Sequence, residues 1–170
     1  KIKSFLNKKN FGVKILISDE KEMLLDTGGG LKNIIKNFNK EPFLTINPDT
    51  VWGNNYQEEF IKMTKIFNKQ KKPILMVVNK MLSKEIFSGD FNMDHNNVIT
   101  RGKDNKFIFT GMQLMKENMM PEIDKKIFSM NLIWDKLIER KDLLGFESEK
   151  EFLHINTTEA FERIQKLNIN

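Results

Sequence analysis

The chain contains no cysteine and only two histidines, His95 and His154. The absence of cysteine excludes a disulfide framework, a thiolate zinc site, an iron–sulfur cluster and a cysteine nucleophile. No apolar run approaches the roughly 18 to 20 residues that cross a bilayer, and the first residues lack the apolar region of a signal peptide. These absences predict a cytoplasmic protein with no membrane partner.

Arginine is almost as scarce, because Arg101, Arg140 and Arg163 are the only three. The formal net charge is +5 at pH 7, which would ordinarily suggest a nucleic-acid partner. Recognition of bases and phosphates favours the bidentate guanidinium group, however, and the lysines are scattered along the chain. We therefore expect no nucleic-acid partner.

The remaining composition is that of a folded protein. Hydrophobic residues make up 39% of the chain and charged residues 30%, which is within the range of globular domains. A chain of 170 residues has the length of one domain, and no linker-like segment divides it. The sequence therefore predicts a single domain over residues 1–170.

Apolar runs alternate with segments of helical periodicity along this domain. The spacing predicts strands at residues 13–18, 43–46, 73–78, 98–100, 107–114, 143–146 and 152–155, and helices at 31–38, 54–68, 130–139 and 157–167. The turn-rich residues 90–97 suggest that the middle of the chain forms a hairpin laid across the sheet. Strands that alternate with helices predict a Rossmann-like three-layer α/β/α fold around a mostly parallel mixed sheet.

In such a sheet, ligands bind beyond the carboxyl ends of the strands. Asp49 follows the apolar run FLTIN, where a carboxylate can bind a hard cation that also binds phosphate oxygens. The alternative role for Asp49 is an Asx turn or a helix cap. His154 follows Phe152 and Leu153, and it is either a metal ligand or a hydrogen-bonded core residue.

A second candidate site is the run Asp26, Thr27, Gly28, Gly29, Gly30, which precedes a predicted helix. Free backbone N–H groups there could receive an anion, or a base could lie flat against the glycines. The alternative is a flexible turn, and the run matches neither GxGxxG nor a P-loop.

Other polar groups carry no site prediction. His95 lies in a polar turn, and the acidic pair Glu58 and Glu59 is interpreted as solvated surface.

Taken in order, these motifs resemble the sugar-1-phosphate nucleotidyltransferases, also called nucleotide-sugar pyrophosphorylases. The resemblance is specific in LLDTGGGLK and NPDTVW, and it continues more loosely through GDFNMD and FIFTGMQLM to FLHINTTEAFERI, so that it covers essentially the whole chain. It is strongest to the bacterial branch that includes N-acetylmuramate-1-phosphate uridylyltransferases and mannose-1-phosphate guanylyltransferase-like proteins.

The resemblance implies a reaction in which a sugar 1-phosphate attacks the α phosphorus of a nucleoside triphosphate and releases pyrophosphate, in cell-envelope nucleotide-sugar biosynthesis. It implies Mg²⁺ or another divalent cation, with Asp49 as a catalytic residue and metal ligand. The implied nucleotide contacts are Asp26, Thr27, Gly28, Gly29 and Gly30, and the implied sugar contacts are Gly89, Thr110 and Asn131.

The sequence departs from the family pattern in two places. His154 stands where the motif WxDxGTPE has its second metal-binding aspartate, so the resemblance implies that His154 is the other metal ligand. The glycine-rich amino-terminal signature is absent from these residues. We therefore expect an N-terminally truncated domain that lacks the first strand–loop–helix unit, and we expect the 170-residue chain alone not to turn over.

The resemblance narrows the base to uridine or guanosine, and its branch favours UTP over GTP. The physical reason is that a few backbone groups can read the smaller pyrimidine edge. Asp26 decides this choice: a carboxylate free in the pocket would favour guanosine, whereas one that caps the helix would favour uridine. Two alternatives remain, a non-catalytic nucleotide-sugar binding or regulatory relative and, if the resemblance is accidental, a general phosphate-binding module.

Overall fold

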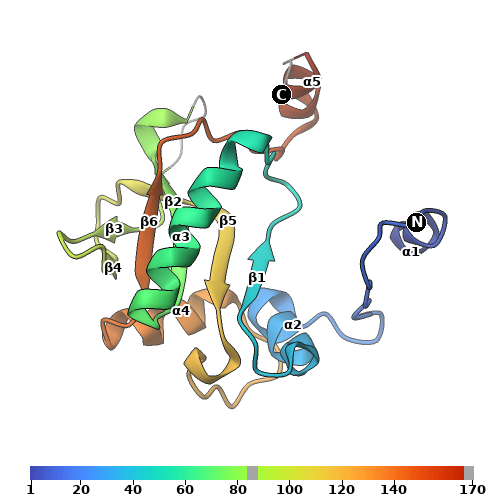
Figure 1. Cartoon of the computed structure of the whole chain (residues 1–170), viewed down its shortest axis with the longest axis horizontal. Helices are drawn as coiled ribbons and strands as arrows, with labels where there is room; N and C mark the ends of the chain where they lie inside the picture. Colours follow the sequence, from blue (N-terminus) through green and yellow to red (C-terminus); the bar gives the residue numbers. More distant parts are fainter. Residues whose placement is uncertain (84–87, 167–170) are drawn as a thin grey trace.

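The computed structural model describes residues 1–83 and 88–166 (Figure 1). The described helices are α1 (Ile2–Leu6), α2 (Asp26–Ile34), α3 (Gln57–Gln70), α4 (Met130–Glu139) and α5 (Thr158–Gln165). The described strands are β1 (Phe43–Ile46), β2 (Ile74–Asn79), β3 (Asn92–Met93), β4 (Ile99–Thr100), β5 (Phe107–Met115) and β6 (Leu144–Ser148).

The main sheet has four strands in the order β1-β5-β2-β6. Strand β5 is antiparallel to both of its neighbours, whereas β2 and β6 are parallel. It follows that β1, β2 and β6 run in one direction and β5 runs in the other. The predicted mixed sheet is confirmed, although two of the three strand pairings in the sheet, both made by β5, are antiparallel.

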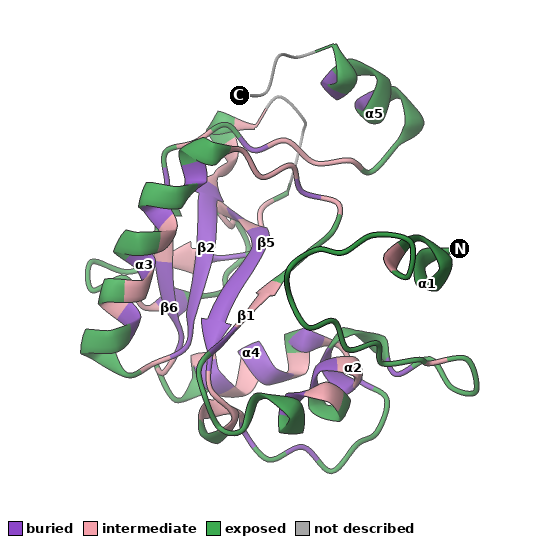
Figure 2. Ribbon diagram, turned by 45° about the vertical axis from the view of Figure 1, so that its right-hand side comes forward, coloured by how far each residue is buried: buried purple, intermediate pink, exposed green. Residues whose placement is uncertain are grey.

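Helices cover both faces of this sheet, and strand β2 shows how the sequence produces the two cores. Ile74 and Met76 pack with residues of α3, whereas Leu75 and Val77 pack with residues of α2 and α4. This alternation follows from the two-residue period of a strand. Figure 2 shows β2 and β5 buried along most of their length between the helices. The predicted three-layer arrangement is therefore confirmed.

Several predicted elements have the predicted position. Strand β1 and helix α4 match residues 43–46 and 130–139, and α3 with the short turn before it matches residues 54–68. The Thr157 hydroxyl accepts a hydrogen bond from the Ala160 N–H and caps α5, although residue 167 of that predicted helix lies outside the described residues. None of the described helices has the length and apolar character needed to cross a membrane.

Two predicted strands are wrong. Residues 13–18 form no strand, because no described strand pairs with this segment and a strand needs a partner for its backbone groups. The side chains of Val13, Ile15, Leu16 and Ile17 are exposed. Figures 1 and 2 show this part of the chain running outside the sheet. Residues 152–155 form only isolated bridges.

The middle of the chain also differs from the prediction. Strands β3 and β4 form a separate two-stranded hairpin, whereas the run at 107–114 enters the main sheet as β5. The apolar side chains of β5 on its two faces explain this difference, because Met115 packs into one core and Met112 and Leu114 pack into the other.

The core predicts a contrast between two aliphatic side chains of the same sheet. Leu75 is fully buried in β2, so Leu75→Ala should lower the free energy of unfolding by about 2–5 kcal/mol. Ile46 at the edge strand is 50% exposed, so Ile46→Ala should cost less than about 1 kcal/mol. Chemical denaturation measures both values, and equal losses would contradict the described burial.

Candidate active site

The structure brings Asp49 and His154 together through their backbones. The N–H of Ile155 donates to the carbonyl of Asp49 at 2.7 Å, and the N–H of Val51 donates to the carbonyl of Leu153 at 2.9 Å. Thr50 and His154 form an antiparallel bridge between these two bonds. The segment after β1 and the segment before α5 are therefore laid side by side.

This pairing places His154 Nε2 3.2 Å from Asp49 Oδ2, so the two groups form an ion pair when the imidazole is protonated. The ring of His154 stacks on Phe152, with centroids 5.7 Å apart and planes 13° apart. Asp49 Oδ1 is buried, and it accepts no hydrogen bond from the described residues. The carboxylate therefore has an oxygen that could bind a cation.

The donor set fits a divalent metal ion. Two protein ligands at about 2.0–2.2 Å from one ion lie roughly 3 Å apart when they are adjacent in an octahedron, which is close to the observed separation. The described residues contain no cluster of three or more His, Cys, Asp or Glu side chains suited to a metal. Water and phosphate oxygens would thus complete the coordination, as is usual for Mg²⁺, whereas the imidazole is better suited to Mn²⁺ or Zn²⁺.

Buried threonines anchor this pair to the sheet. The Thr50 hydroxyl donates to the Thr110 carbonyl at 2.7 Å, and the Thr110 hydroxyl donates to the Met76 carbonyl at 2.9 Å. The Thr110 side chain is fully buried. Thr110 therefore presents no exposed group to a sugar, contrary to its predicted contact. Its hydroxyl instead bonds to the backbone of β2.

The glycine run lies inside α2, not in a turn before a helix. The N–H groups of Gly28 and Gly29 both donate to the carbonyl of Phe128, at 2.9 and 3.0 Å. A Cβ on Gly28 would lie 2.5 Å from the Phe128 ring, and a Cβ on Gly29 would lie 2.4 Å from the Lys126 carbonyl oxygen. The two glycines thus permit close packing, and their N–H groups are already occupied.

Asp26 and Thr27 form the beginning of the same helix. Asp26 has a φ of 62°, and its carboxylate accepts hydrogen bonds from the N–H and the hydroxyl of Thr27. The Thr27 hydroxyl in turn accepts from the N–H of Met130 at 2.9 Å, which ties α2 to the start of α4. Asp26 is thus the first residue of α2 and makes no side-chain cap bond, so it matches neither the helix cap expected with uridine nor the free carboxylate expected with guanosine.

A pocket of about 250 Å³ lies between α2, α4 and the sheet. It is lined by Thr27, Leu31, Thr45, Asn47, Phe109, Gln113, Met130 and Trp134. The Trp134 indole N–H donates to the Gln113 amide oxygen at 3.0 Å, so Gln113 is fixed although it is a buried polar residue. Among the described residues, no lysine or arginine lines this pocket.

Of the predicted site residues, Thr27 alone lines this pocket. Asn47 and Gln113 were not predicted, although a glutamine within the apolar run FIFTGMQLM was a usable signal. Asn47 connects the pocket to Asp49, which lies two residues further along the chain.

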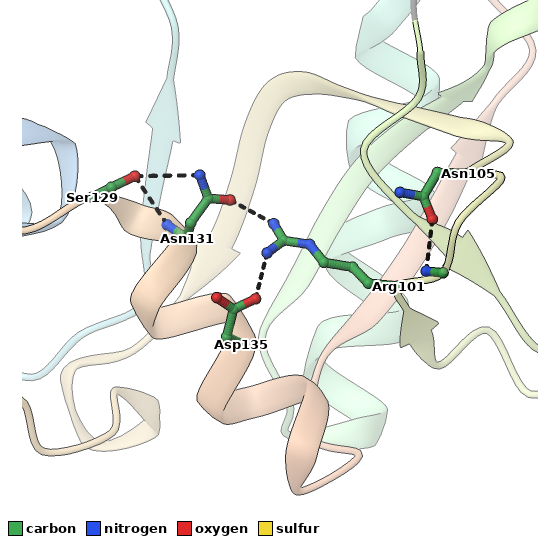
Figure 3. Close-up of polar contacts among 6 residues, drawn as sticks. Arg101, Asn105, Ser129, Asn131 and Asp135 are labelled. Atoms are coloured by element: carbon green, nitrogen blue, oxygen red, sulfur yellow. Dashed lines mark hydrogen bonds and ion pairs between the residues drawn. The ribbon is translucent and has the colours of Figure 1, made fainter.

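The remaining predicted sugar contacts lie outside the pocket lining. Gly89 has a φ of 76°, and a Cβ there would meet the Asn105 carbonyl oxygen at 2.3 Å. Backbone conformation and packing therefore account for a glycine at this position. Asn131 accepts a hydrogen bond from Arg101, whose guanidinium also binds Asp135 (Figure 3). These contacts fix the loop after β4 against α4.

The interpretation of Glu59 as solvated surface is wrong. Its side chain is only 6% exposed, and its carboxylate accepts hydrogen bonds from the Ser148 hydroxyl and the Glu149 N–H. Nearby, Tyr56 donates from its hydroxyl to the Glu151 carbonyl at 3.0 Å. Burial, reinforced by the negative charges of Glu59 and Glu151, raises the pKa of Tyr56 to about 12.

Comparison with known proteins gives one curated relative and several similar structures. No family model matches the chain. The chain is 19% identical over 157 residues to the N-acetylmuramate alpha-1-phosphate uridylyltransferase of Caulobacter vibrioides, a match that covers 89% of this chain and 65% of that protein. The chain thus spans slightly less than two thirds of the length of this relative.

The similar structures include HddC from Yersinia pseudotuberculosis complexed with GMP-PN, with a TM-score of 0.68 and 20% identity over 95% of this chain and 70% of that one. They also include a Bacillus anthracis protein assigned as a glucose-1-phosphate thymidylyltransferase, with a TM-score of 0.61 and 13% identity over 90% of this chain and 65% of that one. The fold is that of the nucleotidyltransferases. The matches support the nucleotidyltransferase resemblance of the sequence, but they do not select a branch of the family.

The glycines of this nucleotidyltransferase fold give a paired prediction. Gly29→Ala should lower the free energy of unfolding by at least about 1 kcal/mol, because its methyl group would meet a backbone carbonyl. At Gly30 the methyl group would meet only the Glu20 carboxylate, which can move, so Gly30→Ala should be neutral or stabilising by up to about 1 kcal/mol. Thermal and chemical denaturation of the two variants would measure this, and a reversed order would contradict the observed packing.

Tyr56 gives a prediction about pH, because it is the only tyrosine of the chain. Its pKa is about 12 in the folded protein and near 10.0 when unperturbed, so the folded state holds the phenolic proton more tightly. The corresponding stability is complete below pH 10 and is lost as the pH rises through 12, on the order of 3 kcal/mol in total. Titration of tyrosinate absorbance with and without denaturant measures both pKa values, and Tyr56→Phe should remove this part of the pH dependence.

Proposed function

We propose that the chain is part of an enzyme that transfers a nucleotidyl group from a nucleoside triphosphate to a sugar 1-phosphate, giving a nucleotide sugar and pyrophosphate. The observation that carries this proposal is the pairing of Asp49 Oδ2 with His154 Nε2, 3.2 Å apart, beyond the end of β1 on a nucleotidyltransferase fold. That edge of the sheet is where α/β proteins bind their ligands.

Asp49 and His154 would hold a divalent cation, Mg²⁺ or Mn²⁺. When bound, the ion would offset the negative charge of the phosphates and favour the attack on the α phosphorus. Asp49 contributes the negative charge and a buried oxygen, and His154 contributes a neutral donor. A site with one carboxylate keeps one negative charge fewer than a site with two, so it opposes the binding of phosphates less.

The pocket beside Thr27 is the proposed position of the base or the sugar. Its volume of about 250 Å³ is smaller than the roughly 300–1,000 Å³ typical of pockets for complete small molecules, so part of the ligand would extend out of it. Asn47 and Gln113 supply polar groups, while Phe109 and Trp134 supply flat apolar surfaces. Asp26, Gly28, Gly29 and Gly30 would act on the nucleotide mainly by shaping α2.

The preference for UTP over GTP remains a proposal. The Caulobacter relative is named a uridylyltransferase, whereas the Yersinia structure is complexed with GMP-PN. The hydrogen bonds that Asp26 accepts from Thr27 support uridine, because they leave the Asp26 carboxylate less available to a guanine amino group.

A second candidate function is a non-catalytic protein that binds nucleotide sugars. The observation that favours it is that none of the described residues of the pocket lining is a lysine or an arginine, since cationic side chains normally hold a triphosphate. Pyrophosphate release separates the two functions, because a binding protein would bind a nucleotide sugar without releasing pyrophosphate.

The test uses the protein expressed from the longest open reading frame that contains these residues. It should release pyrophosphate with UTP faster than with GTP, given Mg²⁺ or Mn²⁺ and a panel of sugar 1-phosphates. Asp49→Asn should lower the rate on the order of 100-fold, as expected for the loss of an electrostatic contact in the transition state. The same change at exposed Asp104 is the control and should have no effect.

Two results would overturn the proposal. Failure of the unaltered protein to release pyrophosphate, together with saturable binding of a nucleotide sugar by calorimetry, would establish the binding protein instead. A faster reaction with GTP would reject the choice of base while leaving the transferase in place.

A further inference from the structure

Glu59 is a buried carboxylate whose described hydrogen-bond partners lie in one short segment, close in the sequence to His154. It is 6% exposed and lies in the first turn of α3. Its Oε2 accepts from the Ser148 hydroxyl at 2.5 Å, and its Oε1 accepts from the Glu149 N–H at 3.1 Å. A buried carboxylate is costly unless such bonds satisfy it, and the bonds from Ser148 and Glu149 supply that compensation.

The contacts continue along the chain from this point. The Ser148 hydroxyl accepts from the Lys150 N–H at 3.1 Å, and Tyr56, which precedes α3, donates to the carbonyl of Glu151 at 3.0 Å. Glu59 and Tyr56 therefore bind Ser148, Glu149 and Glu151, and the bond from Lys150 to Ser148 connects the remaining residue of this segment. The segment turns here, directly after the end of β6.

Only two residues separate this anchored turn from His154. Phe152 is buried in a cluster with Val78 and Ile108, and Leu153 pairs with Val51. Because a chain spans at most about 3.6 Å per residue, a shift of residues 148–151 would be transmitted to His154 over a connection of only two residues.

We propose that Glu59 is a positioning residue that holds residues 148–155 in register with residues 49–51, so that His154 lies against Asp49. The effect of Glu59 on metal binding rests on the proposed function, whereas its effect on the backbone pairing does not. Glu59 touches neither Asp49 nor a substrate group in the described contacts, and it acts through the hydrogen bonds to Ser148 and Glu149.

Two features of the chain make the test specific. His154 and His95 are the only histidines, and His95 lies in an exposed turn, so isotope-labelled histidine gives one imidazole signal at the site and one internal reference. Glu58 has the same charge as Glu59 and is adjacent on α3, but it is exposed. Glu58→Ala is thus the matched control for Glu59→Ala.

The first measurement is the paramagnetic broadening of the two imidazole signals by Mn²⁺. In the unaltered chain, His154 should broaden at much lower Mn²⁺ concentration than His95. Glu59→Ala should raise the Mn²⁺ concentration needed to broaden the His154 signal about tenfold. This is the lower end of the 10–100-fold typical of residues that orient metal ligands. Glu58→Ala should not change it, and Glu59→Gln should restore much of the affinity because its amide oxygen can still accept from the Glu149 N–H.

The second measurement is amide hydrogen exchange without metal. Glu59→Ala should accelerate exchange at Val51 and Ile155, whose N–H groups make the pairing bonds, and should leave the central strand β2 unchanged. If Glu59→Ala does not fold, Ser148→Ala removes one of the two hydrogen bonds and should give the same changes, about threefold instead of tenfold.

The outcomes separate the two proposals. Unchanged Mn²⁺ broadening and unchanged exchange in folded Glu59→Ala or Ser148→Ala would overturn the role of Glu59. If Mn²⁺ fails to broaden His154 before His95 in the unaltered chain, the proposed metal site fails, and the exchange rates at Val51 and Ile155 still decide the positioning role. Equal effects of Glu58→Ala and Glu59→Ala would also overturn it, because they would indicate an effect of net charge.

Discussion

The candidate site depends on one short backbone pairing, that of residues 49–51 with residues 153–155. These segments are far apart in the sequence, and the two hydrogen bonds between them are what bring a carboxylate and an imidazole within 3.2 Å. The sheet supports one side of the pairing through Thr50 and Thr110. Tyr56 and Glu59, at the start of α3, support the other through residues 148–151. The rest of the fold supplies the rigidity that two hydrogen bonds lack.

Local sequence predicted the elements whose own residues carry the full pattern of a strand or a helix. Strand β1 and helix α4 carry their apolar residues at the spacing that their cores require, so their bounds could be read directly. Residues 13–18 have an equally apolar pattern but form no strand, because pairing depends on a neighbouring strand that a local pattern does not reveal. The start of α2 was misplaced for a related reason, since glycine is a poor helix former and only the contacts with Phe128 explain its place there.

The site was predicted in part. The adjacency of Asp49 and His154 followed from a family resemblance, and the structure agrees with it, whereas the metal itself remains a proposal. Glu59 was missed because a glutamate in an amphipathic helix is usually exposed, and its partners Ser148 and Glu149 are distant in the sequence. Thr110 was assigned to a ligand although its hydroxyl serves the neighbouring strand, since a threonine within an apolar run is compatible with either role.

The packing of Gly28 and Gly29 against residues 126–128 has a consequence for the shape of the pocket. Thr27 and Leu31 of α2 form one wall, and Met130 and Trp134 of α4 form another. Gly28 and Gly29 set how closely α2 lies against residues 126–128, the segment that leads into α4. A methyl group at either glycine would push α2 away from this segment and change the spacing of the two walls. The size of ligand that fits would therefore depend partly on residues outside the pocket lining.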